Sequence, residues 1–105
     1  MKLATAFAAV LLLAGASALA QSDAFSFGDR RLGGKALEAK CSRCHVARFG
    51  GDGSGVFTRP DRKVSSAQSL LAWVQRCNAG NKSGLSAEEE ESVAAFLNEG
   101  YYRFK

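Results

Sequence analysis

The sequence predicts an all-α fold in one small domain. Three segments, at about 29–40, 65–77 and 86–97, carry apolar residues at the spacing of an amphipathic helix. Serine-based capping signals open the second and third segments, and turn-forming residues end the second. No run of alternating apolar and polar residues is long enough to indicate a strand. We therefore expect about three helices around one core.

The first 20 residues predict an export signal that is not part of this domain. Met1-Lys2 provide a short positive start, residues 3–14 are almost wholly apolar, and Ala18-Leu19-Ala20 matches an A-x-A cleavage site. The apolar run is shorter than the roughly 20 residues that span a bilayer. We expect cleavage after residue 20, with an uncleaved anchor as the alternative. The domain at 21–105 would then be exported and soluble, most simply in a bacterial periplasm.

The composition of the exported part limits its functions. A chain of this length buries a small core, which usually needs a covalent or metal staple. Lys2 leaves with the signal, so 13 of the 14 basic residues remain against 10 acidic ones, a net charge of +3. This small excess, without a basic stripe interleaved with aromatic residues, argues against nucleic acid as a partner.

The first helix is expected from about Asp29 to Lys40, after a loose segment at 25–28. Gly33-Gly34 would let a neighbouring element approach closely. The remaining packing residues of this helix are expected to be Leu32, Ala36, Leu37 and Ala39.

Directly after this helix, Cys41-Ser42-Arg43-Cys44-His45 forms a Cys-x-x-Cys-His motif, the attachment site of a c-type haem. Two thiols at this spacing can form thioethers with the two vinyl groups of one porphyrin. The histidine that follows is carried beneath the iron and can bind it. The motif therefore predicts one covalently bound haem, attached through Cys41 and Cys44, with His45 as the proximal iron ligand.

Two other interpretations of these cysteines are weaker. Cys41, Cys44, His45 and Cys77 make up a Cys₃His zinc set, but the adjacent Cys44 and His45 would be strained on one ion. A thioredoxin-like Cys-x-x-Cys would need a βαβ pattern around it, and none is present. Haem attachment is the preferred interpretation.

Two irregular segments come next. The glycine-rich stretch 49–55 is interpreted as a surface loop near the haem edge, because no strand and helix flank it as a phosphate-binding loop requires. The charged turn that follows contains Arg59, Arg62 and Lys63, which could bind the haem propionates. A solvated turn is the plainer interpretation.

The second helix is expected to begin at a capping box of Ser65 and Gln68 and to stop within 78–84. Cys77 lies on its apolar face, and Asn78 is about 100° further round the helix. Cys77 could be a buried core cysteine, an iron ligand or a partner in a disulfide, including one that joins two molecules. Asn78 could end the helix or face the iron.

The last helix is expected to begin at Ser86, with Glu89 completing a capping box. The acidic run at 88–91 suits the positive end of the helix dipole, although it could also serve as a docking patch. Its apolar face continues into an aromatic tail. The residues concerned are Val93, Phe96, Leu97, Tyr101, Tyr102 and Phe104.

In order and pattern, residues 21–105 resemble a small class I c-type cytochrome, although only the five-residue haem motif is highly specific. The resemblance implies that the first and last helices cross beside the haem, through Gly33 or Gly34 with Leu37 and through Phe96 and Leu97 with Tyr101. Segment 73–78 also resembles part of a group of high-spin c cytochromes. In that group an asparagine after a cysteine caps the iron and yields to small ligands, but the cysteine pairs with a second one that this chain lacks.

The chain departs from class I cytochromes at the second axial position of the iron. Those proteins usually use a methionine there, and some use a second histidine. The only methionine here is Met1, which leaves with the signal, and the only histidine is His45. Cys77 and Asn78 are therefore the leading alternatives, with Lys82 and the C-terminal tyrosines more remote. Water, a vacancy or a ligand from a partner remain open.

Electron transfer to an unidentified redox partner protein is the first functional hypothesis. Binding of a small ligand such as CO, NO or O₂ at an open iron is the second, and redox sensing through Cys77 is the third. No acid, base or nucleophile is assembled by the sequence, so we do not expect an enzyme. We expect a monomer, with a disulfide-linked dimer through Cys77 as the alternative.

Overall fold

The computed structural model describes residues 23–105, and this part is helical with no strand. The predicted signal at 1–20 lies outside the described residues. The fold class is therefore all-α, as predicted. The α-helices are α1 (Arg30–Lys40), α2 (Ser42–Phe49), α3 (Gly55–Thr58), α4 (Ala67–Asn81) and α5 (Ala87–Leu97), with a 3₁₀ turn at Asp23–Phe25 and a π-helical turn at Asn98–Tyr102.

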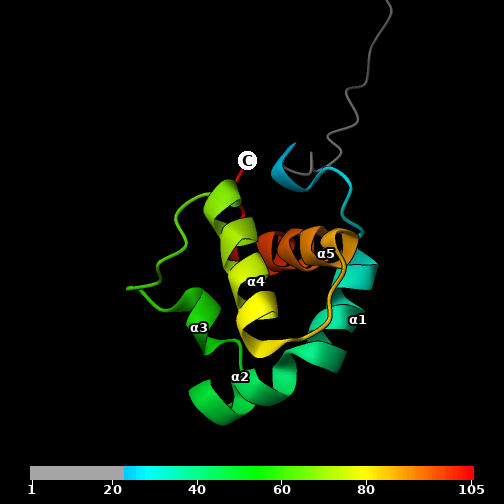
Figure 1. Ribbon diagram of the computed structural model, residues 1–105. Coiled ribbons are helices and arrows are strands. Elements are labelled where there is room, and N and C mark those ends of the chain that lie inside the picture. Colours follow the sequence, from blue (N-terminus) through cyan, green and yellow to red (C-terminus); the bar gives the residue numbers. More distant parts are fainter. Residues whose placement is uncertain (1–22) are drawn as a thin grey trace, which may run out of the picture.

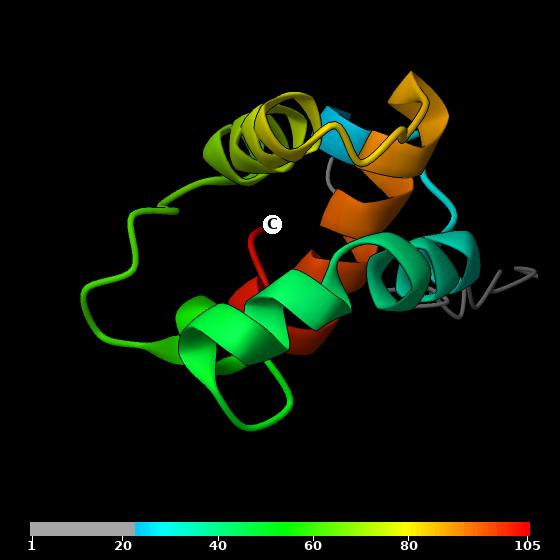
Figure 2. The same cartoon turned by 60° about the horizontal axis from the view of Figure 1, so that its bottom comes forward.

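Helices α1 and α4 are distant in the sequence, and α5 runs between them in space (Figures 1 and 2). Helix α5 makes its largest contact with α1 and a second one with α4. Seen from the side, α4 and α2 lie on opposite sides of the molecule, with α5 behind them (Figure 2). The core residues that hold this arrangement include Leu70 and Val74 of α4, and Val93 and Leu97 of α5.

Helices α1 and α5 cross at glycines. A Cβ on Gly33 would lie only 1.8 Å from the Ser92 carbonyl oxygen, so a larger residue cannot occupy this position without separating the helices. The neighbouring Gly34 lies against the Phe96 ring. The buried Ser92 hydroxyl accepts a hydrogen bond of 2.9 Å from the Asp29 amide, at the N-cap of α1. The expected crossing of α1 and α5 is therefore present. It fixes the position of the C-terminal end of α1, where α2 begins.

The predicted third helix is confirmed in detail. The Ser86 hydroxyl accepts from the Glu89 amide, and the Glu89 carboxylate accepts from the Ser86 amide, which completes the expected capping box. Acidic side chains occupy the first turn, where the helix dipole favours them. Beyond Leu97 the chain forms a π-helical turn, and Asn98 then bonds the amide and carbonyl of Phe104.

The boundaries of the second helix were predicted incorrectly. Its capping box consists of Ser66 and Ser69, because the Ser66 hydroxyl accepts from the Ser69 amide while the Ser69 hydroxyl accepts from the Ser66 amide. The helix also continues through the expected stop and ends at Asn81. Lys82, with φ of 51°, provides the left-handed residue that terminates it.

Two helices were not predicted. The Cys-x-x-Cys-His segment does not form an isolated turn but opens α2, which contains no helix breaker before Gly50 at φ 74°. The single turn of α3 begins inside the glycine-rich stretch. Leu32 and Ala39 are exposed rather than packed, whereas Phe25, in the segment expected to be loose, is fully buried.

Within residues 23–105, no helix combines the length and the apolar character that crossing a membrane requires.

Candidate functional site

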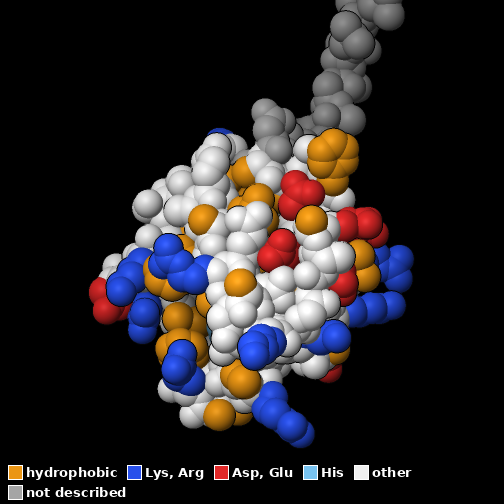
Figure 3. Space-filling model, viewed as in Figure 1, with side chains coloured by type: hydrophobic (Ala, Val, Ile, Leu, Met, Phe, Trp, Pro, Cys, Tyr) orange, Lys and Arg blue, Asp and Glu red, His pale blue; other side chains and the backbone are white. Residues whose placement is uncertain are grey.

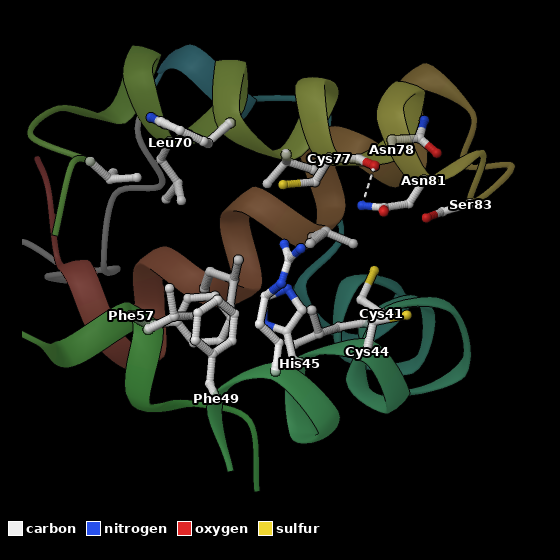
Figure 4. Close-up of a pocket in the computed structure, with 18 of the residues that line it drawn as sticks. Cys41, Cys44, His45, Phe49, Phe57, Leu70, Cys77, Asn78, Asn81 and Ser83 are labelled. Carbon is white, nitrogen blue, oxygen red and sulfur yellow. Dashed lines mark hydrogen bonds between the residues drawn. The ribbon is translucent and has the colours of Figure 1, made fainter.

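A cavity of about 640 Å³ occupies the space between α2 and α4 (Figure 4). Its walls are mostly apolar and come from all five helices and from the segments that join them. This volume falls in the range of about 300–1,000 Å³ that is typical of small-molecule and cofactor sites. The domain therefore has a chamber of cofactor size beside its packed core.

The Cys-x-x-Cys-His residues form one wall of this cavity. Cys41 lies at the junction where α1 ends and α2 begins, and Cys44 and His45 follow in the first turns of α2. All three line the cavity, and the His45 ring points from α2 towards α4 (Figure 4). The structure thus brings both thiols and the imidazole to the same chamber.

Aromatic rings hold the imidazole of His45. Its ring centroid lies 5.5 Å from that of Phe49 and 5.3 Å from that of Phe57. Burial lowers the pKa of His45, the Gly53 backbone partly offsets this effect, and the Arg48 charge adds to it, so that the neutral ring is favoured. A neutral imidazole is the form that can bind a metal.

The Gly50–Ser54 loop packs directly behind His45. Gly53 has φ of 84°, and a Cβ there would lie 2.8 Å from the His45 Cβ, so only glycine permits this approach. Nδ1 of His45 is buried and makes no hydrogen bond to the residues that the structure describes, although the Gly53 backbone lies near enough to raise the pKa. Because Nδ1 is turned away from solvent, Nε2 is the nitrogen left to face the cavity.

The three cysteines are free thiols around one cavity. Burial raises the pKa of Cys41, and the neighbouring Cys77 and Cys44 thiols raise it further. Across the described part of the chain, however, no three Cys, His, Asp or Glu side chains converge closely enough to hold a metal ion. The residues of the zinc interpretation therefore line a common chamber without forming an ion site.

Helix α4 provides the wall opposite His45. Its lining residues repeat at helical spacing, and the Cys77 thiol points into the chamber (Figure 4). The side chain is exposed, which excludes the interpretation of Cys77 as a buried core cysteine. The residues of α4 that line the cavity are Leu70, Trp73, Val74, Cys77, Asn78 and Asn81.

Asn78 does not end the helix, because α4 continues to Asn81. Its side chain ties down the following loop instead. The amide nitrogen donates to the Leu85 carbonyl and to the Glu90 carboxylate, each at 2.9 Å, and the amide oxygen accepts from the Leu85 amide at 2.9 Å. Any role at a metal would require some of these bonds to break.

Asn81 is a cavity residue that the sequence reasoning missed. It lies one turn after Cys77, on the same helix face, and its side-chain nitrogen donates to the Cys77 carbonyl at 3.0 Å (Figure 4). The spacing of four residues was a usable signal, but the helix was expected to have stopped before it.

Five basic residues line the cavity. Within residues 23–105, no acidic residue lines it. Arg59, Arg62 and Lys63 were the predicted anion-binding group, and Lys40 and Arg48 were not predicted. Lys and Arg side chains gather on the face that carries α2 and α3 (Figure 3). The rim of the cavity is therefore suited to anionic groups.

Two of these arginines are already positioned by other contacts. Arg62 donates to the Phe57 carbonyl at 3.0 Å, and its guanidinium lies 4.6 Å from the ring centroid of Tyr102. Arg59 lies 5.9 Å from the Phe49 ring centroid and forms an exposed ion pair of 3.5 Å with Asp61. Burial raises the pKa of Tyr102, and Arg62 and Arg59 partly offset this effect.

No protein-family model, curated protein or solved structure matches this chain.

Proposed function

We propose that this protein is an exported, periplasmic c-type cytochrome that carries single electrons on one covalently bound haem. The observation that carries the proposal is the position of the Cys-x-x-Cys-His motif on an apolar cavity of about 640 Å³. A chance occurrence of the motif would have no reason to face a chamber of cofactor size.

The residues around the cavity fit such a group. Cys41 and Cys44 would form its thioether links, and His45 would bind the iron through Nε2. Lowered pKa and burial of Nδ1 support this role, because they keep the ring neutral and leave Nε2 towards the cavity. A small movement of the Gly53 carbonyl towards Nδ1 would fix the required tautomer.

When bound, the haem would supply a one-electron couple between ferrous and ferric iron. The protein's own residues would orient it and exclude water from its faces. Arg59, Arg62 and Lys63 lie on the rim, where they would neutralise the two propionates. The apolar residues of α4 and α5 would pack against the porphyrin, and an uncovered edge would face the redox partner protein.

Haem attachment is tested by producing the full chain in a bacterial host with c-type maturation proteins. Intact mass and a pyridine haemochrome spectrum of the exported protein should show one haem joined by two thioethers. The Cys41→Ala/Cys44→Ala double variant should have none, whereas Cys77→Ala should still have one. A wild-type protein without bound haem would overturn the proposal.

Small-ligand binding is the second candidate function. It is favoured by the absence of any methionine or second histidine from residues 21–105, so that the usual sixth ligands cannot close the iron. Addition of CO to the reduced protein would shift its absorption spectrum if the position opens. An unchanged spectrum would leave electron transfer as the function.

A further inference from the structure

The cavity carries more positive charge than the two propionates of one haem would neutralise. Five Lys and Arg side chains line it, and none of the 10 Asp and Glu residues, all of which lie within 23–105, does so. The whole chain, by contrast, has 14 basic residues against 10 acidic ones. Positive charge is therefore concentrated at the cavity rather than spread evenly over the molecule.

We propose that this cavity is selective for anions, and that Lys40 and Arg48 draw small inorganic anions to the iron in preference to neutral ligands. This inference rests on the proposed haem function and names the class of ligand for that same site.

The five cations fall into two groups. The predicted anion-binding group follows α3, in the segment that leads to α4 (Figure 2). The other two, the α1–α2 cations, are Lys40, which ends α1 directly before Cys41, and Arg48, which lies one turn after Cys44 on α2. Haem carries its vinyl and propionate groups on opposite edges, so a haem held by both cysteines would direct its propionates away from the α1–α2 cations. These two would therefore keep their charge.

Nearby carboxylates do not cancel the charge of the cavity. Asp61 forms an exposed ion pair with Arg59, and Glu90, which lies outside the lining, accepts a hydrogen bond from Asn78. Within residues 23–105, the α1–α2 cations form no ion pair. The balance at the cavity is therefore positive even when both carboxylates are counted.

These charges favour anions in the cavity. Tyr102 is a lining residue whose pKa is raised by burial, while the Arg62 and Arg59 charges act the other way, in favour of the phenolate anion. A cleft with apolar walls and charges of one sign concentrates the opposite ion and speeds its entry by about 10- to 1,000-fold. A neutral ligand gains nothing from this field, so the cavity should discriminate by charge.

The first test uses the unaltered holoprotein. Azide is the anionic probe and imidazole is the neutral one, at about pH 8, where imidazole carries no charge. Stopped-flow absorption of the ferric protein measures both association rates, from low salt to about 1 M sodium chloride. Screening of the cations should slow azide by about tenfold or more and leave the imidazole rate within about twofold.

The second test removes the α1–α2 cations. Lys40→Gln/Arg48→Gln should bind azide about threefold or more slowly at low salt, with the imidazole rate unchanged. Arg31→Gln/Lys35→Gln is the matched control, because it also removes one Arg and one Lys, from exposed positions of α1 outside the cavity lining. The control should lose much less, since the effect depends on where the charges lie and not on net charge alone.

Three results would overturn the inference. They are a ferric spectrum that azide does not change, azide and imidazole rates with the same salt dependence, or an equal loss of azide rate in the two double variants. In each case the haem is bound, so the proposed cytochrome function stands. A chain exported without covalent haem would instead overturn both proposals.

Discussion

Gly33 sets the separation of the two helices that support the candidate site. A methyl group at this position would meet the Ser92 backbone of α5 at 1.8 Å. By contrast, a Cβ on Gly80 of α4 would meet nothing within 4 Å, and its backbone is helical. The same substitution should therefore have opposite effects at the two positions.

We expect Gly33→Ala to destabilise the protein by about 1–3 kcal/mol, because the crossing is overpacked. Gly80→Ala should stabilise it by about 0.5–1 kcal/mol, since alanine is the better helix former. Denaturant unfolding of the two variants beside the wild type measures both effects. Equal and small changes in the free energy of unfolding would show that α1 and α5 do not cross as described.

Asn78 is a structural tether on the evidence of its three hydrogen bonds. Asn78→Ala should lower the free energy of unfolding by about 1–3 kcal/mol, because the Leu85 amide and carbonyl lose their partner. Asn81→Ala removes one exposed bond and should cost less. If Asn78→Ala leaves stability unchanged but alters the haem spectrum, Asn78 is an iron ligand instead.

Tyr102, in the cavity wall, should make the stability of the folded protein depend on pH in the alkaline range. Burial raises its pKa above the ordinary 10.0, so the folded protein favours the protonated phenol. Its contribution to stability should be complete below pH 10.0 and lost as the pH rises through the folded-state pKa. Unfolding measurements across this range should show the loss in wild type, and a Tyr102→Phe variant that loses stability equally would contradict the assignment.

At the scale of elements, predictions from the sequence succeeded where the interactions that decide the structure join residues only a few positions apart. The Ser86–Glu89 capping box was predicted from its spacing, and the first and last helices begin within a residue of the expected positions. The Cys-x-x-Cys-His motif likewise selected three residues that all line the cavity, while their attachment to haem stays a prediction. In each case the responsible interactions are formed by neighbours in the chain.

Predictions failed where distant contacts decide the structure. The turn-forming residues within 78–84 suggested that the second helix stops there, but the Asn78 side chain bonds Leu85 and Glu90, which lie beyond the helix. Phe25 looked like part of a loose segment and is buried against the core. The role of Asn81 was hidden by the same early stop, because the pairing with Cys77 appears only when α4 extends to it.

At the scale of the whole molecule, the cavity implies that the polypeptide alone is incompletely packed. A chamber of about 640 Å³ leaves the apolar side chains that line it without packing partners on the cavity side, which loses dispersion contacts. A bound haem would restore them and would stabilise the folded state, because it binds only that state. Fold and cofactor are therefore expected to be coupled.

This coupling predicts that a chain unable to attach haem is less stable. The Cys41→Ala/Cys44→Ala variant should unfold at a lower temperature than the wild-type holoprotein and with a broader transition. Circular dichroism during heating measures both properties. A Cys77→Ala holoprotein, which keeps both attachment cysteines, serves as the control. Equal unfolding temperatures for the double variant and the wild type would show that haem in the cavity does not stabilise the folded protein.

The most direct test of the central claim is the intact mass of the protein exported from a bacterial host that attaches c-type haem. We predict a chain that begins at residue 21 and carries one haem, held through Cys41 and Cys44. A chain that emerges with both thiols free and no haem would contradict the account.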